Sequence, residues 1–234
     1  LIEIPELYST SIPESKSLAL QRAKIVVCML ELELIKEFKY VLKKYLKNKI
    51  IISMMPSIEI STISKLTGSK KIIRAISNPP VLTYTGTHVL VATHQVAHED
   101  KILIEKLYST TGQVQWLSCE NQADAIIAIS GAGPAYFLYI LDSLVKASID
   151  IGIEEQLSLN LLIQAASGAF DMLSKSTIQP ATLCTKLTPP DGVTESALRI
   201  FELGNVSLDL NLAVKAAYSR SKEISTEINS KIQK

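Results

Sequence analysis

The chain has 234 residues, of which 47% are apolar, and it carries 24 basic against 23 acidic side chains. This composition can build one large hydrophobic core or two modest ones, which excludes a chain that is disordered throughout. A formal net charge of +1 gives no long-range field that would attract nucleic acid or an anionic membrane. We therefore expect the partners to be small molecules or other protein chains.

The cysteines and the chain start indicate a cytoplasmic protein. Cys28, Cys119 and Cys184 are odd in number and far apart, a pattern that favours neither a disulfide framework nor a zinc site. The opening "LIEIPELYST" lacks the basic and apolar regions of a secretory signal. Because glycine and proline interrupt the longest apolar stretch, residues 125–141, we expect no membrane span. The chain does not begin with Met, so we expect it to be part of a longer polypeptide.

The first half alternates short strand-like runs with helical periodicity. We expect strands over residues 23–30, 49–54, 71–76, 87–94 and 113–118, and helices over residues 31–46, 58–66 and 99–110. Alternation of this kind implies crossover connections and a mostly parallel sheet.

Beyond Cys119 the strand signals nearly vanish, and helical periodicity takes over. We expect helices over residues 120–129, 134–149, 154–174, 180–187, 194–203 and 208–228. The sequence therefore predicts an α/β domain over residues 1–119, followed by an all-α domain over residues 120–234.

A glycine- and proline-rich motif, Ser130-Gly131-Ala132-Gly133-Pro134, precedes a strongly apolar helical pattern. The motif predicts a tight turn, with the proline at the first helical position, where its missing N–H costs no hydrogen bond. A helix N-terminus offers free N–H groups and a positive dipole to an anion. From these residues alone, an anion site and a plain helix–helix turn both stay open.

A second motif, "LTPPDGVTESALRIFELG" over residues 187–204, has two prolines and a glycine before a helix that contains Thr194. The Thr194 hydroxyl can cap this helix, a role worth about 1 kcal/mol. Alternatively, the free N–H groups around Val193 and Thr194 hold a carboxylate.

Together the two motifs resemble pyrroline-5-carboxylate reductase, the last enzyme of proline biosynthesis. Its S-G-S-G-P-A-Y motif is similar to residues 130–136, and its T-S-P-G-G-x-T signature is similar to residues 188–194. The resemblance extends from about Ala23 to Ser225.

The resemblance implies a Rossmann-like domain that binds NADPH or NADH, truncated here, and a helical domain that forms a homodimer and in some assemblies a higher oligomer. It implies reduction of 1-pyrroline-5-carboxylate to L-proline by hydride transfer, with no metal. Thr194 would act as the catalytic residue, its hydroxyl near the ring nitrogen of the substrate. Substrate binding would fall to Ser130, Gly131, Gly133, Pro134, Gly192, Val193 and Thr194, and cofactor binding to the turn Asn78, Pro79 and Pro80.

The chain departs from the family pattern at several of these positions. No G-x-G-x-x-G turn precedes the first expected strand, and Leu30-Glu31-Leu32 stands where the family has V-K-P. The other changes place Ser57 and Asp191 at family glycines, Ala132 and Pro189 at serines, and Pro79 at a threonine. An alternative function therefore stays open, that of a noncatalytic homologue whose helical dimer domain serves assembly or regulation.

Histidine and cysteine chemistry offers little beyond this. His94 and His98 have the i,i+4 spacing of a metal pair, but no further ligand completes a site, so we expect all three histidines, His88 included, on the exposed surface. Cys119 and Cys184 have no base nearby in the sequence, and we expect ordinary buried or half-buried thiols.

Overall fold

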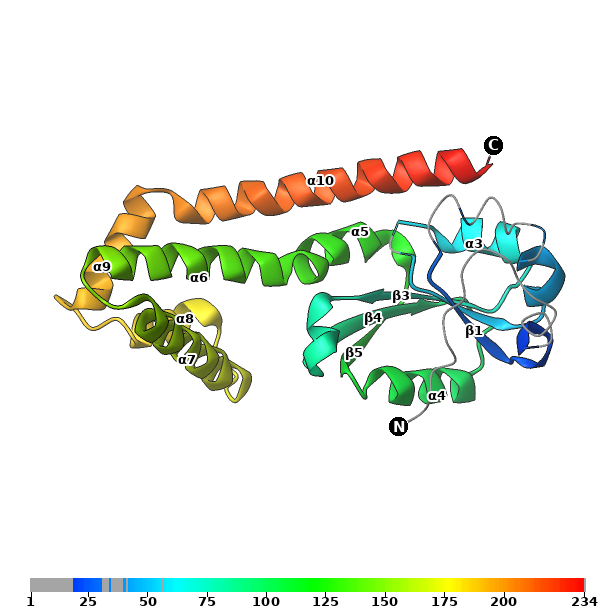
Figure 1. Ribbon diagram of the computed structural model, residues 1–234, viewed down its shortest axis with the longest axis horizontal. Helices are drawn as coiled ribbons and strands as arrows, with labels where there is room; N and C mark the ends of the chain where they lie inside the picture. The colour runs from blue at the N-terminus through cyan, green and yellow to red at the C-terminus, as the bar shows by residue number, and fades with distance from the viewer. Residues whose placement is uncertain (1–18, 31–33, 35–39, 41, 56, 234) are drawn as a thin grey trace. The chain divides into compact units, whose positions relative to one another are not determined.

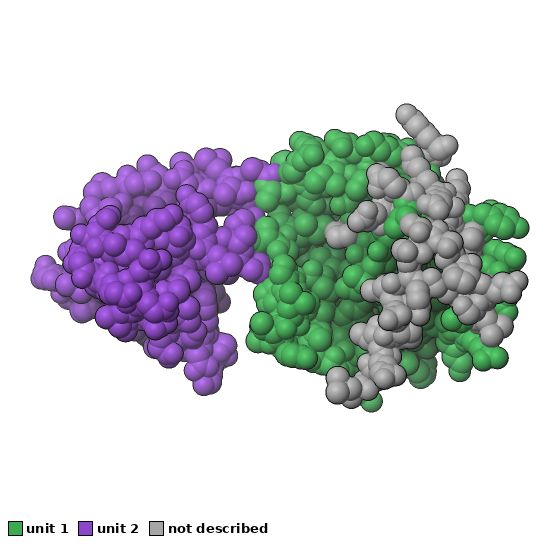
Figure 2. Space-filling view, viewed as in Figure 1, with its two compact units in different colours: residues 1–132, 217–234 green, residues 133–216 purple. Residues whose placement is uncertain are grey.

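A computed structural model describes residues 19–30, 34, 40, 42–55 and 57–233. The chain folds into two compact units, coloured separately in Figure 2. Unit 1 contains the described residues up to Ala132 and those from Ala217 onward, and unit 2 is Gly133–Ala216.

Unit 1 is built on a five-stranded sheet in the order β1-β2-β3-β4-β5. The strands are β1 (Ile25–Cys28), β2 (Ile50–Ser53), β3 (Ile72–Ser77), β4 (Gly86–Ala92) and β5 (Gly112–Leu117). Only β3 and β4 pair antiparallel, while the other three pairs are parallel. The five predicted strands and the mostly parallel sheet are confirmed. The predicted helix over residues 31–46 lies largely outside the described residues, although residues 42–46 are helical.

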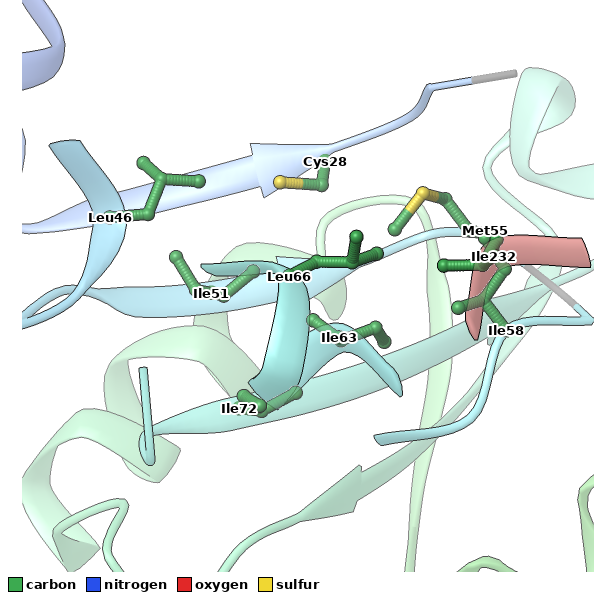
Figure 3. Packing of buried hydrophobic residues seen from close by; sticks show 9 residues of the cluster. All are labelled: Cys28, Leu46, Ile51, Met55, Ile58, Ile63, Leu66, Ile72 and Ile232. Carbon is green, nitrogen blue, oxygen red and sulfur yellow. The ribbon is translucent and has the colours of Figure 1, made fainter. Parts of the chain in front are cut away.

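Helices cover both faces of this sheet, with α3 (Ile60–Thr67) on one side and α4 (His98–Tyr108) on the other (Figure 1). Ile51 and Ile72 point toward Ile63 and Leu66 of α3, as Figure 3 shows. On the opposite face, a second cluster joins β-strand residues to α4, and its members include Ile52, Ile73, Leu90, Ile104 and Tyr108. Burial on both faces explains why β2 and β3 begin with consecutive apolar residues, whereas β5 at the sheet edge alternates glutamine with apolar residues.

The end of the chain completes the core of unit 1. Helix α10 (Val206–Gln233) carries Ile232, which packs with Met55, Ile58 and Cys28 (Figure 3). A division of the chain at residue 119 would separate these contacts from the sheet. The two units are defined by contacts between residues, whereas the predicted domains are defined by the type of secondary structure. The two divisions are not equivalent, so the predicted boundary at residues 119–120 stays a prediction.

Polar side chains tie this chain end to the sheet, and we call them the polar clamp. Its members are Arg74, Glu120, Asp124, Ser221, Ser225 and Asn229. The Glu120 carboxylate accepts from buried Arg74 of β3 at 2.5 Å and from the Ile60 N–H that opens α3 at 3.0 and 3.1 Å. The remaining contacts come from α10: Ser221 and Ser225 donate to Asp124 Oδ1 at 2.8 and 2.9 Å, and Asn229 Nδ2 donates to the Ser57 carbonyl at 2.9 Å. The outgoing segment at residues 120–124 and the returning helix are therefore both fixed to unit 1.

The glycine motif does not form the predicted tight turn. The chain runs through α5 (Ala123–Ile126) and a π-helical turn, η3 (Ile127–Gly131), into α6 (Gly133–Asp150). The Ala132 N–H donates to the Ile127 carbonyl at 3.0 Å, and neither Gly131 nor Gly133 has a left-handed backbone. The prediction of a helix break was wrong because an extra residue was absorbed as a wider helical turn, a device that often marks functional positions.

Unit 2 consists of α6, α7 (Glu155–Ser174), α8 (Pro180–Lys186), α9 (Val193–Leu203) and the start of α10. Helices α6 and α7 pack through the Phe137 and Phe170 rings, whose centroids lie 5.4 Å apart edge to face, and through a hydrogen bond between the hydroxyls of Ser148 and Ser158. This mixed α/β and all-α architecture is the predicted fold class.

Unit 2 leaves most of its apolar side chains uncovered. Among residues 133–216, only Gly133, Val145 and Ser158 are buried, while Phe137 and Leu138 are 59% and 64% exposed. An apolar surface of this extent marks an interaction site. By length and composition, the stretch Glu120–Asp150 would also suffice to cross a membrane.

Candidate functional site

The turn after β3 is held in one conformation by its asparagine. Asn78 Oδ1 accepts from the Thr87 N–H at 2.8 Å, and the Asn78 N–H donates to the Thr87 carbonyl at 3.3 Å. Pro79 and Pro80 then open the 3₁₀ helix η1 (Pro79–Thr83), with Pro79 exposed. The antiparallel pairing of β3 with β4 places Thr87 opposite Asn78, and this partner was not predicted from the sequence.

The structure brings two predicted site residues together across 52 positions of sequence. Asn78 Nδ2 donates to the Ser130 carbonyl at 3.2 Å and lies 3.5 Å from the Ser130 hydroxyl. Pro134 stands four residues after Ser130 and has no N–H to donate to that carbonyl, as an α-helical residue otherwise would. The proline of the motif therefore leaves the Ser130 carbonyl accessible to a donor from the Asn78 turn.

The other predicted motif forms the N-terminus of α9. Gly192 is the N-cap, and a Cβ at this position would lie 3.0 Å from the Pro189 carbonyl oxygen, so the glycine permits a close approach. Thr194 is the second helical residue and not the N-cap, so the structure does not support the capping role, which was one of the two alternatives left open by the sequence. Within the described residues, the N–H groups of Val193 and Thr194 have no hydrogen-bond acceptor. Because N–H groups at a helix start point out of the helix end, these two can donate to a ligand.

The position before this N-cap has an unusual backbone. Asp191 has φ +58°, in the left-handed region, and its N–H donates to Glu195 Oε2 at 2.7 Å. A neighbouring cavity of about 770 Å³ is lined by Asp191, Glu195, Glu202 and Arg199, together with Cys184, Thr185, Thr188, Ser196 and Leu198. Three carboxylates against one guanidinium make this cavity acidic, and it does not include Gly192, Val193 or Thr194.

Ser130 and Gly131 belong to unit 1, whereas Gly133, Pro134 and residues 192–194 belong to unit 2. The structure thus assembles Asn78 with Ser130 and separately exposes the amides of Val193 and Thr194. That these two groups meet around one substrate stays a prediction.

Comparison with known proteins covers both units. The family described as pyrroline-5-carboxylate reductase dimerisation matches residues 120–224. The pyrroline-5-carboxylate reductase of Pseudomonas aeruginosa is 29% identical over 94% of this chain and 82% of its own length, and that of Haemophilus influenzae is 30% identical over 76% and 67%. A solved pyrroline-5-carboxylate reductase from Coxiella burnetii superposes with a TM-score of 0.82 at 30% identity, covering 91% of this chain and 80% of that one.

The chain belongs to the pyrroline-5-carboxylate reductase family. A second solved member, from Plasmodium falciparum with NADP bound, superposes with a TM-score of 0.81 at 27% identity, covering 89% of this chain and 80% of that one. The resemblance predicted from the two motifs is confirmed, and so is the predicted combination of a Rossmann-like domain and a helical domain.

His88 of this reductase is buried, although we expected it to be exposed. It is 3% exposed, with Nδ1 2.7 Å from the Ser77 hydroxyl and Nε2 2.9 Å from the Thr111 hydroxyl. The Tyr108 ring packs against it edge to face at 4.9 Å. Desolvation lowers the pKa of His88 below its ordinary value of 6.5. His88 therefore pins the end of β3 directly before Asn78, because it pairs with Ser77 in the sheet register.

We expect the stability of the protein to fall as the pH drops below the ordinary histidine pKa of about 6.5. A folded-state pKa below the unfolded one means that the unfolded chain binds the extra proton first, so acid favours unfolding until both states are protonated. His88→Gln should reduce this pH dependence, since glutamine can still bond a hydroxyl. The change in melting temperature between about pH 7.5 and pH 5.5 measures this dependence, and His94→Gln, at an exposed histidine, is the control. A slope equal in wild type and His88→Gln contradicts this role.

The remaining candidates carry no chemistry. The described residues contain no group of three His, Cys, Asp or Glu side chains that could hold a metal. Cys119 and Cys184 are exposed rather than buried or half-buried as predicted, because they lie at a strand end and on a short surface helix. Cys28 is buried, and desolvation raises the pKa of its thiol to about 11, which keeps it protonated and unreactive.

Proposed function

We propose that this chain reduces 1-pyrroline-5-carboxylate to L-proline with NAD(P)H, as a cytoplasmic enzyme of proline biosynthesis. The observation that carries the proposal is the similarity to named pyrroline-5-carboxylate reductases across both units, at 29% identity over 94% of the chain. The contact of Asn78 with Ser130 supports it, because it joins the two segments that the family resemblance assigns to cofactor and substrate.

In this proposal, backbone amides bind the substrate. The uncommitted N–H groups of Val193 and Thr194, at the positive end of the α9 dipole, would hold the substrate carboxylate. The Thr194 hydroxyl, which has no hydrogen-bond partner among the described residues, would lie near the ring nitrogen and act on the proton there. Ser130, Gly131, Gly133 and Pro134 would also contact the substrate. The carboxylates of Asp191 and Glu195 must point away from the substrate carboxylate, since like charges repel.

The described residues fit the nicotinamide end of a cofactor. Exposed Pro79 and half-buried Pro80 offer a rigid apolar surface at the carboxyl end of β3, where ligands of parallel sheets bind, and Asn78 fixes that surface through Thr87 and Ser130. No glycine-rich turn for the pyrophosphate follows β1, β2 or β3 in the described part of the chain. The cofactor, NADPH or NADH, supplies a hydride when bound, and the task of this chain is to hold two flat rings face to face.

We also propose that the helical unit assembles as a homodimer, with a higher oligomer as a further step. The dimerisation family matches residues 120–224, and the uncovered side chains of α6 and α7 are those that a second copy would bury. Burial in a dimer would also explain the apolar composition of the stretch Glu120–Asp150, so that no membrane is needed to cover it. In detergent-free solution, light scattering should give at least twice the chain mass. A monodisperse monomer would contradict the proposal.

The enzymatic proposal is tested by mixing the purified chain with pyrroline-5-carboxylate and following the loss of nicotinamide fluorescence, with NADPH and NADH in separate assays. We expect oxidation of at least one cofactor that depends on the substrate, and formation of L-proline. The alternative, a noncatalytic assembly or regulatory homologue, rests on the substitutions Pro79, Asp191 and Ser57. An absence of saturable binding of either cofactor at concentrations of about 1 mM, the upper end of usual KM values, would favour this alternative.

A further inference from the structure

One lysine precedes each of three neighbouring strands in unit 1. Lys24, Lys49 and Lys71 stand immediately before β1, β2 and β3. The parallel register pairs Lys24 with Lys49, and the Ile50 N–H donates to the Lys24 carbonyl at 3.0 Å. Lys71 is offset by one residue and pairs with Ile50, and the Ile51 N–H donates to its carbonyl at 2.9 Å. Since adjacent strands lie about 4.8 Å apart, the three lysine backbones lie close together at the amino edge of the sheet.

These lysines line a cavity of about 580 Å³, which we call the basic pocket. Its cationic lining consists of Arg22, Lys24, Lys44, Lys47, Lys49 and Lys71, and Asp100 is the one acidic side chain in its lining. The cationic residues come from the segments that precede the three strands and from the helical stretch before β2, and Asp100 comes from α4, so the pocket is formed by elements of unit 1 alone. The volume lies within the range of small-molecule sites.

The charge of the basic pocket is not compensated within the described part of the chain. None of its six cations forms an ion pair with a described carboxylate. Lys49 Nζ donates instead to two backbone carbonyls, those of Gln21 at 2.9 Å and Ala23 at 2.5 Å, and the Lys44 ammonium lies 5.1 Å from the centre of the Tyr45 ring. The whole chain has a net charge of only +1, so this concentration of positive charge is local.

We propose that the basic pocket binds a small anion with two or more linked phosphates, a class that includes inorganic polyphosphates and nucleoside polyphosphates. Cations that line one pocket repel one another, and a multivalent anion among them removes that repulsion. Ammonium groups bind phosphate as point charges without a fixed fork geometry, which suits a phosphate chain more than a single oriented carboxylate.

The basic pocket is separate from the proposed cofactor site. Lys71 precedes β3, whereas Asn78 follows it, so the two sites lie at opposite ends of the same strand, roughly 20 Å apart. Binding at the amino edge therefore does not depend on the reductase proposal. If the chain binds polyphosphate but does not reduce pyrroline-5-carboxylate, the inference stands and only the proposed function fails.

The test is calorimetric titration of the whole chain with sodium tripolyphosphate and, separately, with ATP. We expect saturable binding whose affinity falls with added salt. The triple variant Lys24→Gln/Lys47→Gln/Lys71→Gln should weaken tripolyphosphate binding by at least about tenfold, the sum of three surface charge contacts. Equal affinity for both probes would identify the phosphate chain as the ligand, and tighter binding of ATP would identify a nucleoside polyphosphate.

The matched control removes the same charge elsewhere. Lys65→Gln/Lys106→Gln/Lys186→Gln changes three exposed lysines that do not line the basic pocket. It should leave the affinity within about twofold, because it removes the same total charge without changing any residue that lines the basic pocket. The inference is overturned by an absence of saturation, by equal weakening in both triple variants, or by a duplex oligonucleotide that binds more tightly than both probes.

Discussion

Replacing Glu120 by glutamine is expected to lower the free energy of unfolding by about 3 kcal/mol, toward the lower end of the range for breaking a buried ion pair. The Arg74 side chain is 3% exposed, and its charge would lose the carboxylate 2.5 Å away. The lower end applies because the Glu120 side chain is 25% exposed and retains some access to water. The same substitution weakens the acceptor for the Ile60 N–H at the start of α3. Thermal melting should show a fall of about 6 to 12 °C.

A matched control separates this effect from a general loss of negative charge. Asp171→Asn removes an exposed i,i+4 pair with Lys175, for which we expect at most about 0.5 kcal/mol. The double variant Arg74→Met/Glu120→Gln should recover more than half of the loss, because it removes the buried charge together with the carboxylate that faces it. An unfolding free energy for Glu120→Gln that equals the control's would show that the clamp does not hold unit 1 together.

The strands of unit 1 could be predicted because local pattern and tertiary burial agree. Ile51 and Ile72 face one helix while Ile52 and Ile73 face the other, so β2 and β3 both begin with consecutive buried isoleucines, directly after a lysine. Polar contacts over long sequence separations could not be predicted in the same way. Nothing local to Arg74 or Asn229 indicates that the first pairs with Glu120 and the second reaches Ser57.

The residues of the candidate site stay a prediction, and the local geometry of the two motifs that carry them could not be predicted from the sequence. The glycines at positions 131 and 133 predicted a break, yet the helix continues through a π-helical turn because neither glycine needs a left-handed backbone. At the second motif, Asp191 rather than a glycine takes the left-handed position. His88 was predicted to be exposed because no further metal ligand accompanies the histidines in the sequence, but its partners Ser77 and Thr111 are brought to it by the fold of the sheet.

Asn78→Ala is expected to lower kcat/KM for the proposed reduction by about 100-fold, the scale reached when a positioning group shifts a reacting pair by about 1 Å. Alanine removes the acceptor of the Thr87 N–H and the donor to the Ser130 carbonyl, so the Pro79-Pro80 surface would no longer be fixed relative to the Ser130 segment. The expected loss is therefore mainly in kcat, measured by steady-state kinetics, with thermal melting to confirm that the variant is folded.

Two further variants test which hydrogen bond of Asn78 matters and whether the loss of any amide side chain has the same effect. Asn78→Asp keeps an acceptor for the Thr87 N–H but replaces the donor to Ser130 with a negative oxygen, so we expect a loss of activity at least as large with less effect on stability. Asn160→Ala removes an exposed amide on α7 that bonds only Gln156 Nε2 among the described residues, and it should leave kcat unchanged. If Asn78→Ala retained kcat/KM within about threefold, or less than 1 kcal/mol of transition-state stabilisation, the contact with Ser130 would not organise catalysis. If Asn78→Asp alone retained it, the bond to Thr87, and not the bond to Ser130, would position the turn.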